Sequence, residues 1–433
     1  MAPEHMILFP FMAQGHIFPF MALARVLEQR TGYTITFVNT PLNVQAARAA
    51  FPSTTAIRFA ELPFDSSDHG LPPSTENTDG LPYSLVCALM EASLTLRPAF
   101  ERLVSCIISL PKKKKDNVLC ASSLIFSSDG RSTSPRAWAS FTPCSPSMPS
   151  VWPSISPSGF ASLTTTRPIP TRFVSPTSRC RFPSTALSSR TIWLPPMRKD
   201  GGGEGLDYWV SSMLHNEVRS RKEDGVLKVM NACIEWLDQH SPASVLYICF
   251  GSMNTISASQ MMEFAIGLEE CRKPFIWVIR TPLGHEINGE FRSEWLPPGW
   301  APQLEILSHE SVGAFLSHCG WNSTVESLTR GVPIIGWPLS AEQFYNSKML
   351  EEILCVSVEI ARTNRSEIHR GHVAAMIEMV MGETEKGQDM RRRAVSVKEV
   401  LAAAVRDDEG SKGSSIRAVD GFLSAAIFMR KFG

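Results

Sequence analysis

One continuous run, from Trp300 to Gln343, constrains this 433-residue chain more than any other part of it. Within it, residues 313–318 (GAFLSH) and 332–337 (VPIIGW) are short apolar segments that we predict as buried strands. Between them a glycine turn leads into a helix that we expect to begin near Asn322. A strand, a turn and a helix in this order point backbone N–H groups outward at the helix N-terminus, where a phosphate is stabilised. The run therefore predicts an α/β unit with an anion site at its turn.

The polar residues at this turn also have an ordinary structural explanation. Asn322 and Ser323 are common N-cap residues, and Ser323 with Glu326 has the spacing of a capping box. Taken alone, His318 is more often structural than a ligand, and tryptophans at these spacings are more often packing residues. Local patterns leave both interpretations open.

The whole run closely resembles the signature box of plant family-1 UDP-dependent glycosyltransferases, which also extends from such a tryptophan to such a glutamine. Every anchor of that box is present here. The resemblance implies that Trp300 stacks on uracil and that Gln303 lies close to the base or the ribose, and it includes Ala301 in the UDP-sugar site. Glu326 would take the two ribose hydroxyls, which suits an acceptor-only carboxylate that faces two donors.

The same resemblance implies a set of groups for the diphosphate and the sugar. Phosphate oxygens would lie at the helix start, and sugar hydroxyls would meet the end of the box. The phosphate set is His318, Asn322 and Ser323, and the sugar set is Glu342 and Gln343. Trp321 is a further residue of the UDP-sugar site. Glutamine at the last position favours glucose in this family.

The first forty residues form a second informative stretch. Residues 6–11 (MILFPF) and 33–38 (YTITFV) predict strands, and the apolar residues between them recur at helical spacing. Ligands of such βαβ units lie at the carboxyl ends of strands, where the turn 14–16 falls. His16 in this turn has an even chance of being only a polar turn residue. The string FPFMAQGHIFPFMALA resembles the same family's N-terminus, where the matching histidine is the general base, a task that suits a pKa of about 6.5.

The second half repeats the α/β pattern. Residues 244–250 and 275–280 predict strands around a helix at 260–268. By the resemblance, Ser252 after the first of these strands approaches the donor phosphates, whereas by itself it is equally a turn or N-cap serine. We expect the GT-B architecture, an α/β fold with two facing Rossmann-like domains and parallel sheets. The predicted divisions are an acceptor domain at 1–225, a UDP-sugar domain at 226–415, and a helix at 416–433 that packs back towards the first domain.

The middle of the chain departs from the family. Between Ala121 and Arg190, serine, threonine and proline make up 37 of 70 residues, and Asp129 is the only acid. The segment shows no sustained helix or strand period, and its prolines would interrupt either structure. A disordered linker is one interpretation, but its tryptophans and phenylalanines argue against a simple linker. We favour another, that residues 121–198 are read out of frame.

This departure affects the predicted catalysis. In the family, an aspartate on the strand that enters this segment orients the catalytic histidine. Its position falls near Leu124, and Asp129 lies close by in foreign context. A second departure lies between Arg280 and Trp300, where the family's helix and short strand are shortened or missing.

Composition excludes several other classes of protein. Lys plus Arg equals Asp plus Glu, so no charge favours nucleic acid or an anionic membrane. The ten cysteines contain no C-x-x-C pair, which favours reduced thiols and no metal site. The N-terminus has no basic segment before its apolar run, and no stretch of about 20 apolar residues occurs. We therefore expect a cytoplasmic monomer without a signal peptide or a membrane span.

The sequence predicts a UDP-glycosyltransferase of plant secondary metabolism that transfers a sugar, with glucose favoured, to a small lipophilic acceptor by inverting displacement. No metal or other cofactor is expected, since the helix N-terminus and His318 stabilise the leaving UDP. Two alternatives remain: a catalytically impaired UDP-sugar-binding pseudoenzyme, and the unstable product of a damaged gene. A nicotinamide oxidoreductase is excluded because no G-x-G-x-x-G follows the first strand.

Overall fold

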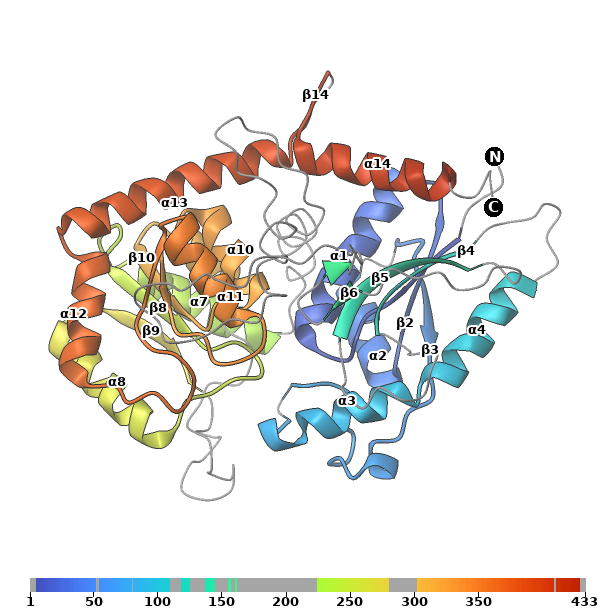
Figure 1. Cartoon of the computed structure of the whole chain (residues 1–433), viewed down its shortest axis with the longest axis horizontal. Helices are drawn as coiled ribbons and strands as arrows, with labels where there is room; N and C mark the ends of the chain where they lie inside the picture. Colours follow the sequence, from blue (N-terminus) through green and yellow to red (C-terminus); the bar gives the residue numbers. More distant parts are fainter. Residues whose placement is uncertain are drawn as a thin grey trace, which may run out of the picture. The chain divides into compact units, whose positions relative to one another are not determined.

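The computed structural model describes ten stretches of the chain, which divide between two compact units (Figure 1). Unit 1 comprises Met1–Val210 with Asp407–Gly433, and unit 2 comprises Ser211–Arg406. The described residues are 5–51, 54–79, 81–109, 118–124, 137–144, 155–156, 160–161, 224–279, 302–408 and 410–428.

Unit 1 is built on a five-stranded sheet with the order β3-β2-β1-β4-β5. Its strands are β1 (His5–Phe9), β2 (Thr34–Asn39), β3 (Arg58–Glu61), β4 (Val118–Leu124) and β5 (Ala137–Cys144). All neighbours are parallel except β4 and β5, which are antiparallel. Parallel neighbours need crossover connections, and α1 (Gln14–Arg30) and α2 (Pro41–Ala50) supply two of them. The remaining elements of this unit's first part are η1 (Ser66–His69), η2 (Tyr83–Leu85), α3 (Val86–Leu94), α4 (Arg97–Ser109) and the short pair β6 (Ile155–Ser156) and β7 (Phe160–Ala161).

Unit 2 contains a second five-stranded sheet, with the order β12-β11-β10-β8-β9 and every neighbour parallel. Its strands are β8 (Val245–Cys249), β9 (Phe275–Val278), β10 (Val312–Ser317), β11 (Ile334–Gly336) and β12 (Ser357–Glu359). Its helices are α7 (Asp224–Leu237), α8 (Ala258–Cys271), α9 (Gln303–Ser308), α10 (Trp321–Arg330), α11 (Gln343–Lys348), η4 (Met349–Ile353), α12 (Arg370–Met381) and α13 (Glu385–Ala404).

The two faces of the unit 2 sheet are covered by different helices, because successive strand residues point to opposite sides. Leu246 and Ile248 of β8 join a buried cluster with α8 and α12, which lie together at the edge of the unit in Figure 1. Val245 and Tyr247 join a second cluster with α7 and α9. Tyr247 therefore lies on the face that carries α9, the first helix of the predicted donor box.

The C-terminal segment returns to unit 1. After α13 the chain forms a small hairpin, β13 (Asp407–Asp408) and β14 (Ser411–Lys412), and then α14 (Ser414–Phe428). Arg30 at the end of α1 forms ion pairs with Asp407 at 2.6 Å and with Asp420 at 3.3 Å. These pairs tie the segment to the first crossover helix of unit 1.

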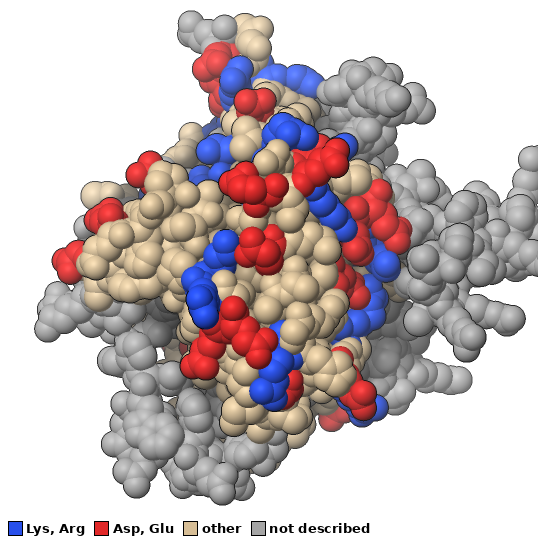
Figure 2. All heavy atoms as spheres, turned by 90° about the vertical axis from the view of Figure 1, so that its left-hand side faces the viewer, with Lys and Arg blue, Asp and Glu red and all other residues tan. Residues whose placement is uncertain are grey.

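Charges of both signs lie side by side on the face shown in Figure 2. Unit 2 contains ion pairs between side chains of opposite sign, among them Arg370–Glu263, Lys273–Glu378 and Arg393–Asp389. A basic stripe of the kind that follows a nucleic acid backbone is not visible on this face. Among the described residues, no helix is both long and apolar enough to cross a membrane.

The predicted α/β fold with parallel sheets is confirmed, with one local difference. The edge strand β5 pairs antiparallel with β4, and it comes from the segment whose composition departs from the family. An antiparallel edge strand on an otherwise parallel sheet is a common arrangement. The strands predicted in both halves are present, with ends shifted by at most two residues. The expected shortening before Trp300 lies outside the described residues.

Candidate active site

The turn between β10 and α10 is fixed by its own hydrogen bonds. Cys319 has φ 60°, a left-handed conformation that is uncommon outside glycine. Its backbone N–H donates to Ser317 Oγ at 3.1 Å, and its carbonyl accepts from Asn346 Nδ2 at 2.9 Å. The turn is therefore held in one conformation at the carboxyl edge of the sheet, where ligands of such sheets bind.

The capping-box explanation for the polar residues at this turn is wrong. The N-cap residue of α10 is Gly320, which has no side chain to cap the helix, and the helix begins at Trp321, one residue before Asn322. Ser323 and Glu326 are the third and sixth helical residues, so neither occupies the position that a capping box requires. Their side chains are available for another task.

His318 lies in a slot between two glycines. A Cβ atom added at Gly251 would come within 2.6 Å of the His318 imidazole, and one added at Gly320 would meet its Nε2. The ring is 9% exposed, and Gly251 has φ +77°, which favours glycine by itself. The absence of side chains at two positions thus fixes the place of one imidazole beside the N-terminus of α10.

Gln303 joins Ser323 and Glu326 in a buried hydrogen-bond network. Its Nε2 donates to Ser323 Oγ at 3.0 Å and to Glu326 Oε2 at 2.6 Å. Its Oε1 accepts from the hydroxyl of Tyr247 at 3.2 Å. The four side chains are between 0% and 8% exposed, and buried polar groups of this kind are specific because each unmet bond is costly.

The end of the box forms a loop that Gln343 holds closed. Its Oε1 accepts from the backbone N–H groups of Leu339 and Ser340, both at 3.0 Å. Burial raises the pKa of the neighbouring Glu342 carboxyl, while backbone hydrogen bonds from Glu342 itself and from Trp321 act in the opposite direction. The bond to Trp321 brings the Glu342 carboxyl to the first residue of α10, an end of the helix that favours negative charge.

The predicted donor residues that the structure describes gather at the carboxyl ends of neighbouring strands in unit 2. Ser252 is half-buried and follows Gly251 at the end of β8, beside the slot for His318. Asn322 is half-buried in the first turn of α10. Trp300, predicted to stack on uracil, and Ala301 are outside the described residues.

His16 lies in the first turn of α1, at the carboxyl end of β1 in unit 1. Its ring meets that of Phe11 edge to face, with centroids 5.6 Å apart. Burial lowers the pKa of His16 to about 4, so the imidazole is neutral at pH 7. A neutral imidazole accepts a proton, but a pKa this low makes it a weaker base than an ordinary histidine.

The strand that should carry an orienting acid is present and in register. β4 runs parallel to β1, with Phe9 opposite Ser122, so Leu124 at its end lies at the same edge as the turn to α1. No side chain among the described residues hydrogen-bonds to the His16 imidazole, and position 124 holds leucine. Asp129 lies outside the described residues.

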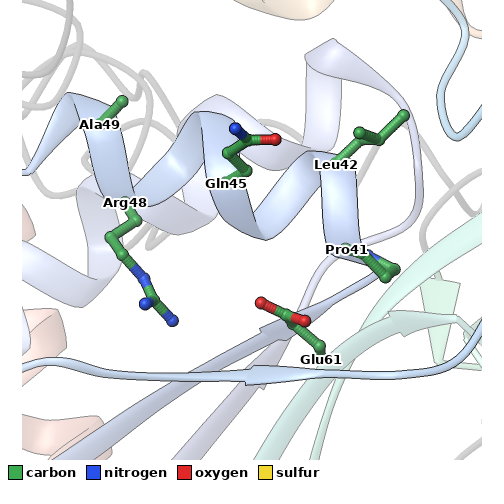
Figure 3. A pocket seen from close by; sticks show the side chains of 6 residues that line it. All are labelled: Pro41, Leu42, Gln45, Arg48, Ala49 and Glu61. Carbon is green, nitrogen blue, oxygen red and sulfur yellow. The ribbon is translucent and has the colours of Figure 1, made fainter.

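Within the described residues, neither a cluster of metal-ligating side chains nor the hollow in Figure 3 involves the predicted site residues. The described part of the chain holds no group of three metal-ligating side chains. Figure 3 shows an open hollow between α2 and β3, into which Arg48 and Glu61 point. Its lining residues are Pro41, Leu42, Gln45, Arg48, Ala49 and Glu61, and none of them is a predicted site residue.

Three residues of the site escaped the sequence analysis: Tyr247, Gly251 and Gly320. Tyr247 lies within a strand whose other residues are apolar, and no local pattern distinguishes it from a core aromatic. The glycines are in turns that the sequence predicts, but their contact with one imidazole depends on tertiary structure. The signal for Tyr247 was a hydroxyl in a fully buried strand, since buried tyrosines usually find a hydrogen-bond partner.

Comparison with known proteins gives one consistent result. The model of the UDP-glucoronosyl and UDP-glucosyl transferase family matches residues 228–391. The chain is 36% identical to UDP-glycosyltransferase 92A1 of Arabidopsis thaliana, over 97% of this chain and 96% of that protein. It is 35% identical to crocetin glucosyltransferase 3 of Crocus sativus, over 81% and 85%.

Solved structures agree with this result at the level of the fold. A structure of Glycyrrhiza uralensis UGT73P12 with glycyrrhetinic acid 3-O-monoglucuronide aligns with a TM-score of 0.64 and 19% identity, over 99% of this chain and 96% of that one. Arabidopsis thaliana UGT89C1 complexed with UDP aligns with a TM-score of 0.63 and 21% identity, over 98% and 99%. The alignment with UDP-glycosyltransferase 92A1 extends over 493 positions against 433 residues here, so at least 60 of its positions have no counterpart in this chain.

Proposed function

The chain belongs to the plant family-1 UDP-dependent glycosyltransferases, and from this premise we propose that it binds UDP-glucose through the β10–α10 turn of unit 2. His318 and the first turn of α10, with Asn322 and Ser323, would hold the diphosphate, while Glu326 takes the ribose hydroxyls. The single observation that carries this proposal is the buried cluster around Glu326, in which Gln303 donates to the carboxylate and which is not a capping box. A buried carboxylate suits the two hydroxyl donors of a ribose, and the N-terminus of α10 suits a diphosphate.

The remaining predicted donor residues take the other parts of UDP-glucose. Trp300 would lie against uracil within a site that includes Ala301, Ser252 would approach the phosphates from the end of β8, and Glu342 and Gln343 would meet the sugar hydroxyls. Support for the sugar site is the position of Glu342 at the first residue of α10. The helix N-terminus would stabilise the negative charge of the departing UDP, so no metal is needed.

The reaction that this arrangement supports is an inverting displacement. The oxygen of a small lipophilic acceptor bonds to the anomeric carbon while the bond from that carbon to the diphosphate breaks. UDP departs with the electron pair, and the acceptor's hydroxyl proton passes to His16. A neutral imidazole at pH 7 is the protonation state that this step requires. A cytoplasmic monomer remains the simplest cellular form of such an enzyme.

A second candidate function is that of a pseudoenzyme that binds UDP-sugar without efficient transfer. The observation that favours it is leucine at the end of β4, where the family's orienting aspartate is expected. Without a carboxylate the imidazole is neither held in the right tautomer nor stabilised once charged. We attribute the missing acid to a shift of reading frame across residues 121–198, which re-reading codons 118 to 200 tests.

Two measurements separate these functions. Calorimetry with UDP tests the donor site, and an assay with UDP-glucose and a phenol tests transfer. Binding with transfer supports the enzyme, and binding without transfer supports the pseudoenzyme. If UDP neither binds nor raises the melting temperature, the product of a damaged gene is the better description.

A further inference from the structure

We propose that Tyr247 and Gln303 are positioning residues that set the selectivity of the donor site for a ribose 2′-hydroxyl, acting through Glu326. This inference rests on the proposed function, in which Glu326 faces the ribose. It adds a residue on a core strand to that site and gives Gln303 a positioning role.

The two hydrogens of the Gln303 amide both have acceptors within the protein. An amide nitrogen has two N–H donors, and Gln303 Nε2 directs one to Ser323 Oγ and the other to Glu326 Oε2. Both donors are therefore used within the protein. In this arrangement Gln303 links Ser323 and Glu326 and holds their side chains in place.

The Tyr247 hydroxyl helps to set the orientation of that amide. A side-chain amide can turn over and exchange its oxygen for its nitrogen, and a carboxylate accepts only from the nitrogen. The Tyr247 hydroxyl donates to Gln303 Oε1 at 3.2 Å, which favours the orientation that points Nε2 at Glu326. Tyr247 is fully buried and stacks on Phe315, with ring centroids 4.9 Å apart, so its hydroxyl has a fixed position.

We call the chain of hydrogen bonds from Tyr247 through Gln303 to Glu326 the relay, and it affects which nucleotide binds. The bond from Gln303 to Glu326 is 2.6 Å long and charge-assisted, which makes it one of the stronger bonds in the cluster. It holds one carboxylate oxygen in place and thereby orients the whole planar group. A carboxylate with a fixed orientation discriminates between a ribose with two hydroxyls and a deoxyribose with one, whereas a mobile carboxylate adapts to either.

Tyr247→Phe tests the relay, because it removes one hydroxyl and preserves the ring. We expect UDP affinity, measured by calorimetry, to fall by about 3- to 10-fold, the range of one hydrogen bond. Affinity for 2′-deoxy-UDP should fall less, so that the ratio of the two constants moves towards one. In a Glu326→Ala background, Tyr247→Phe should change neither constant. Gln303→Met removes both amide donors at similar volume, and it should reduce the ratio in the same way if Tyr247→Phe fails to fold.

Thr324→Val is the matched control. Thr324 is a fully buried residue of α10 whose hydroxyl has no hydrogen-bond partner in the described part of the chain, so its loss should leave the ratio unchanged. An unaltered ratio in Tyr247→Phe and Gln303→Met, or an equal effect with and without Glu326, would overturn the relay while UDP binding stands. A wild-type chain that does not bind UDP would overturn the proposed function, and the relay with it.

Discussion

Each unit has a strand–turn–helix corner with a histidine, but the residues around the two histidines differ. In unit 1, β1 leads through a short turn into α1 with His16, and in unit 2, β10 leads through a short turn into α10 beside His318. The second corner is crowded with specific partners: two glycines enclose the imidazole, and four buried side chains share hydrogen bonds around Glu326. At the first, the described side chains offer His16 an aromatic edge and no hydrogen bond.

The difference between the corners follows from where their supporting residues lie along the chain. The groups around His318 come from residues 247 to 346, nearly all within the family's signature box or next to it. The partner expected for His16 lies on β4, at the entry to the anomalous segment. A change in that segment therefore leaves the donor corner intact and removes the support of the catalytic corner.

Leu124→Asp offers the largest effect on this comparison. In a Ser-His-Asp triad, loss of the orienting carboxylate lowers the rate by about 10⁴. We expect the wild-type chain to transfer glucose to a phenol at a rate reduced by that order. Leu124→Asp should recover a large part of it, and Leu124→Asn, which has the shape without the charge, should not. Product formation from UDP-glucose, followed by chromatography, gives both rates.

One outcome would remove the contrast between the corners. If the chain as it stands glycosylates a phenol at about 1 s⁻¹ or faster, and His16→Ala abolishes that activity, His16 already has an orienting acid. Asp129 is then the first residue to replace.

Glu326→Ala tests the donor corner with the next largest effect. The ribose hydroxyls lose a charged partner, which weakens UDP binding by about 1–3 kcal/mol. Calorimetry measures the change, and a thermal melt without ligand serves as the folding control. Unchanged affinity in a folded variant would show that Glu326 is structural, and the corners would then be alike in lacking a demonstrated ligand.

Gly320→Ala examines the slot that holds His318. Gly320 has φ −61° and ψ 145°, which alanine also adopts, so the added Cβ acts through its overlap with the imidazole. We expect UDP affinity to fall by about 10-fold, at the lower end of the cost of overpacking. In a His318→Ala background the overlap is gone, and Gly320→Ala should then have no effect. Gly371→Ala, where a Cβ meets nothing within 4 Å, is the control.

A remaining effect of Gly320→Ala in the His318→Ala background would have a different meaning. It would show that the glycine serves the approach of a ligand to the helix start rather than the position of the histidine. The cycle thus separates two reasons for a glycine at one N-cap.

Local periodicity predicted the strands β1, β2, β8, β9, β10 and β11 and the helices α1, α8 and α10, whereas it did not identify β3, β12 or α2. Most of these strands are short apolar runs bounded by turn residues, namely β1, β2, β8, β10 and β11. Strands of a parallel sheet are buried on both faces, so they are recognised as such runs. The antiparallel pairing of β5 was not predictable, because a strand carries no mark of its direction and the surrounding segment has no period. It depends on which edge of the sheet is open.

The candidate site was predicted from the signature box rather than from local chemistry. His318, Ser323 and Glu326 are ordinary residues at ordinary spacings, and the local interpretation of the last two as a capping box is wrong because Ser323 lies three positions beyond the N-cap. Tyr247 was missed because its hydroxyl matters only through contact with Gln303, 56 residues away. Contacts of this kind belong to the tertiary structure, and one sequence does not display them.

The smallest effect concerns the acid stability of the His16 corner. Burial holds the pKa of folded His16 at about 4, below the value of about 6.5 in an unfolded chain. Between these values the unfolded chain binds a proton that the folded chain refuses, so stability is full above pH 6.5 and falls as pH decreases towards 4. Because His16 is partly exposed to solvent, we expect the wild-type chain to lose only about 1 kcal/mol more than His16→Gln between pH 7 and pH 5. Urea midpoints at the two pH values measure this difference. An equal loss in both proteins would mean that His16 titrates as an exposed histidine. In Leu124→Asp the difference should shrink, because a nearby carboxylate raises the pKa of the imidazole. His16 would then have a hydrogen-bonding partner, as the side chains around Glu326 already do.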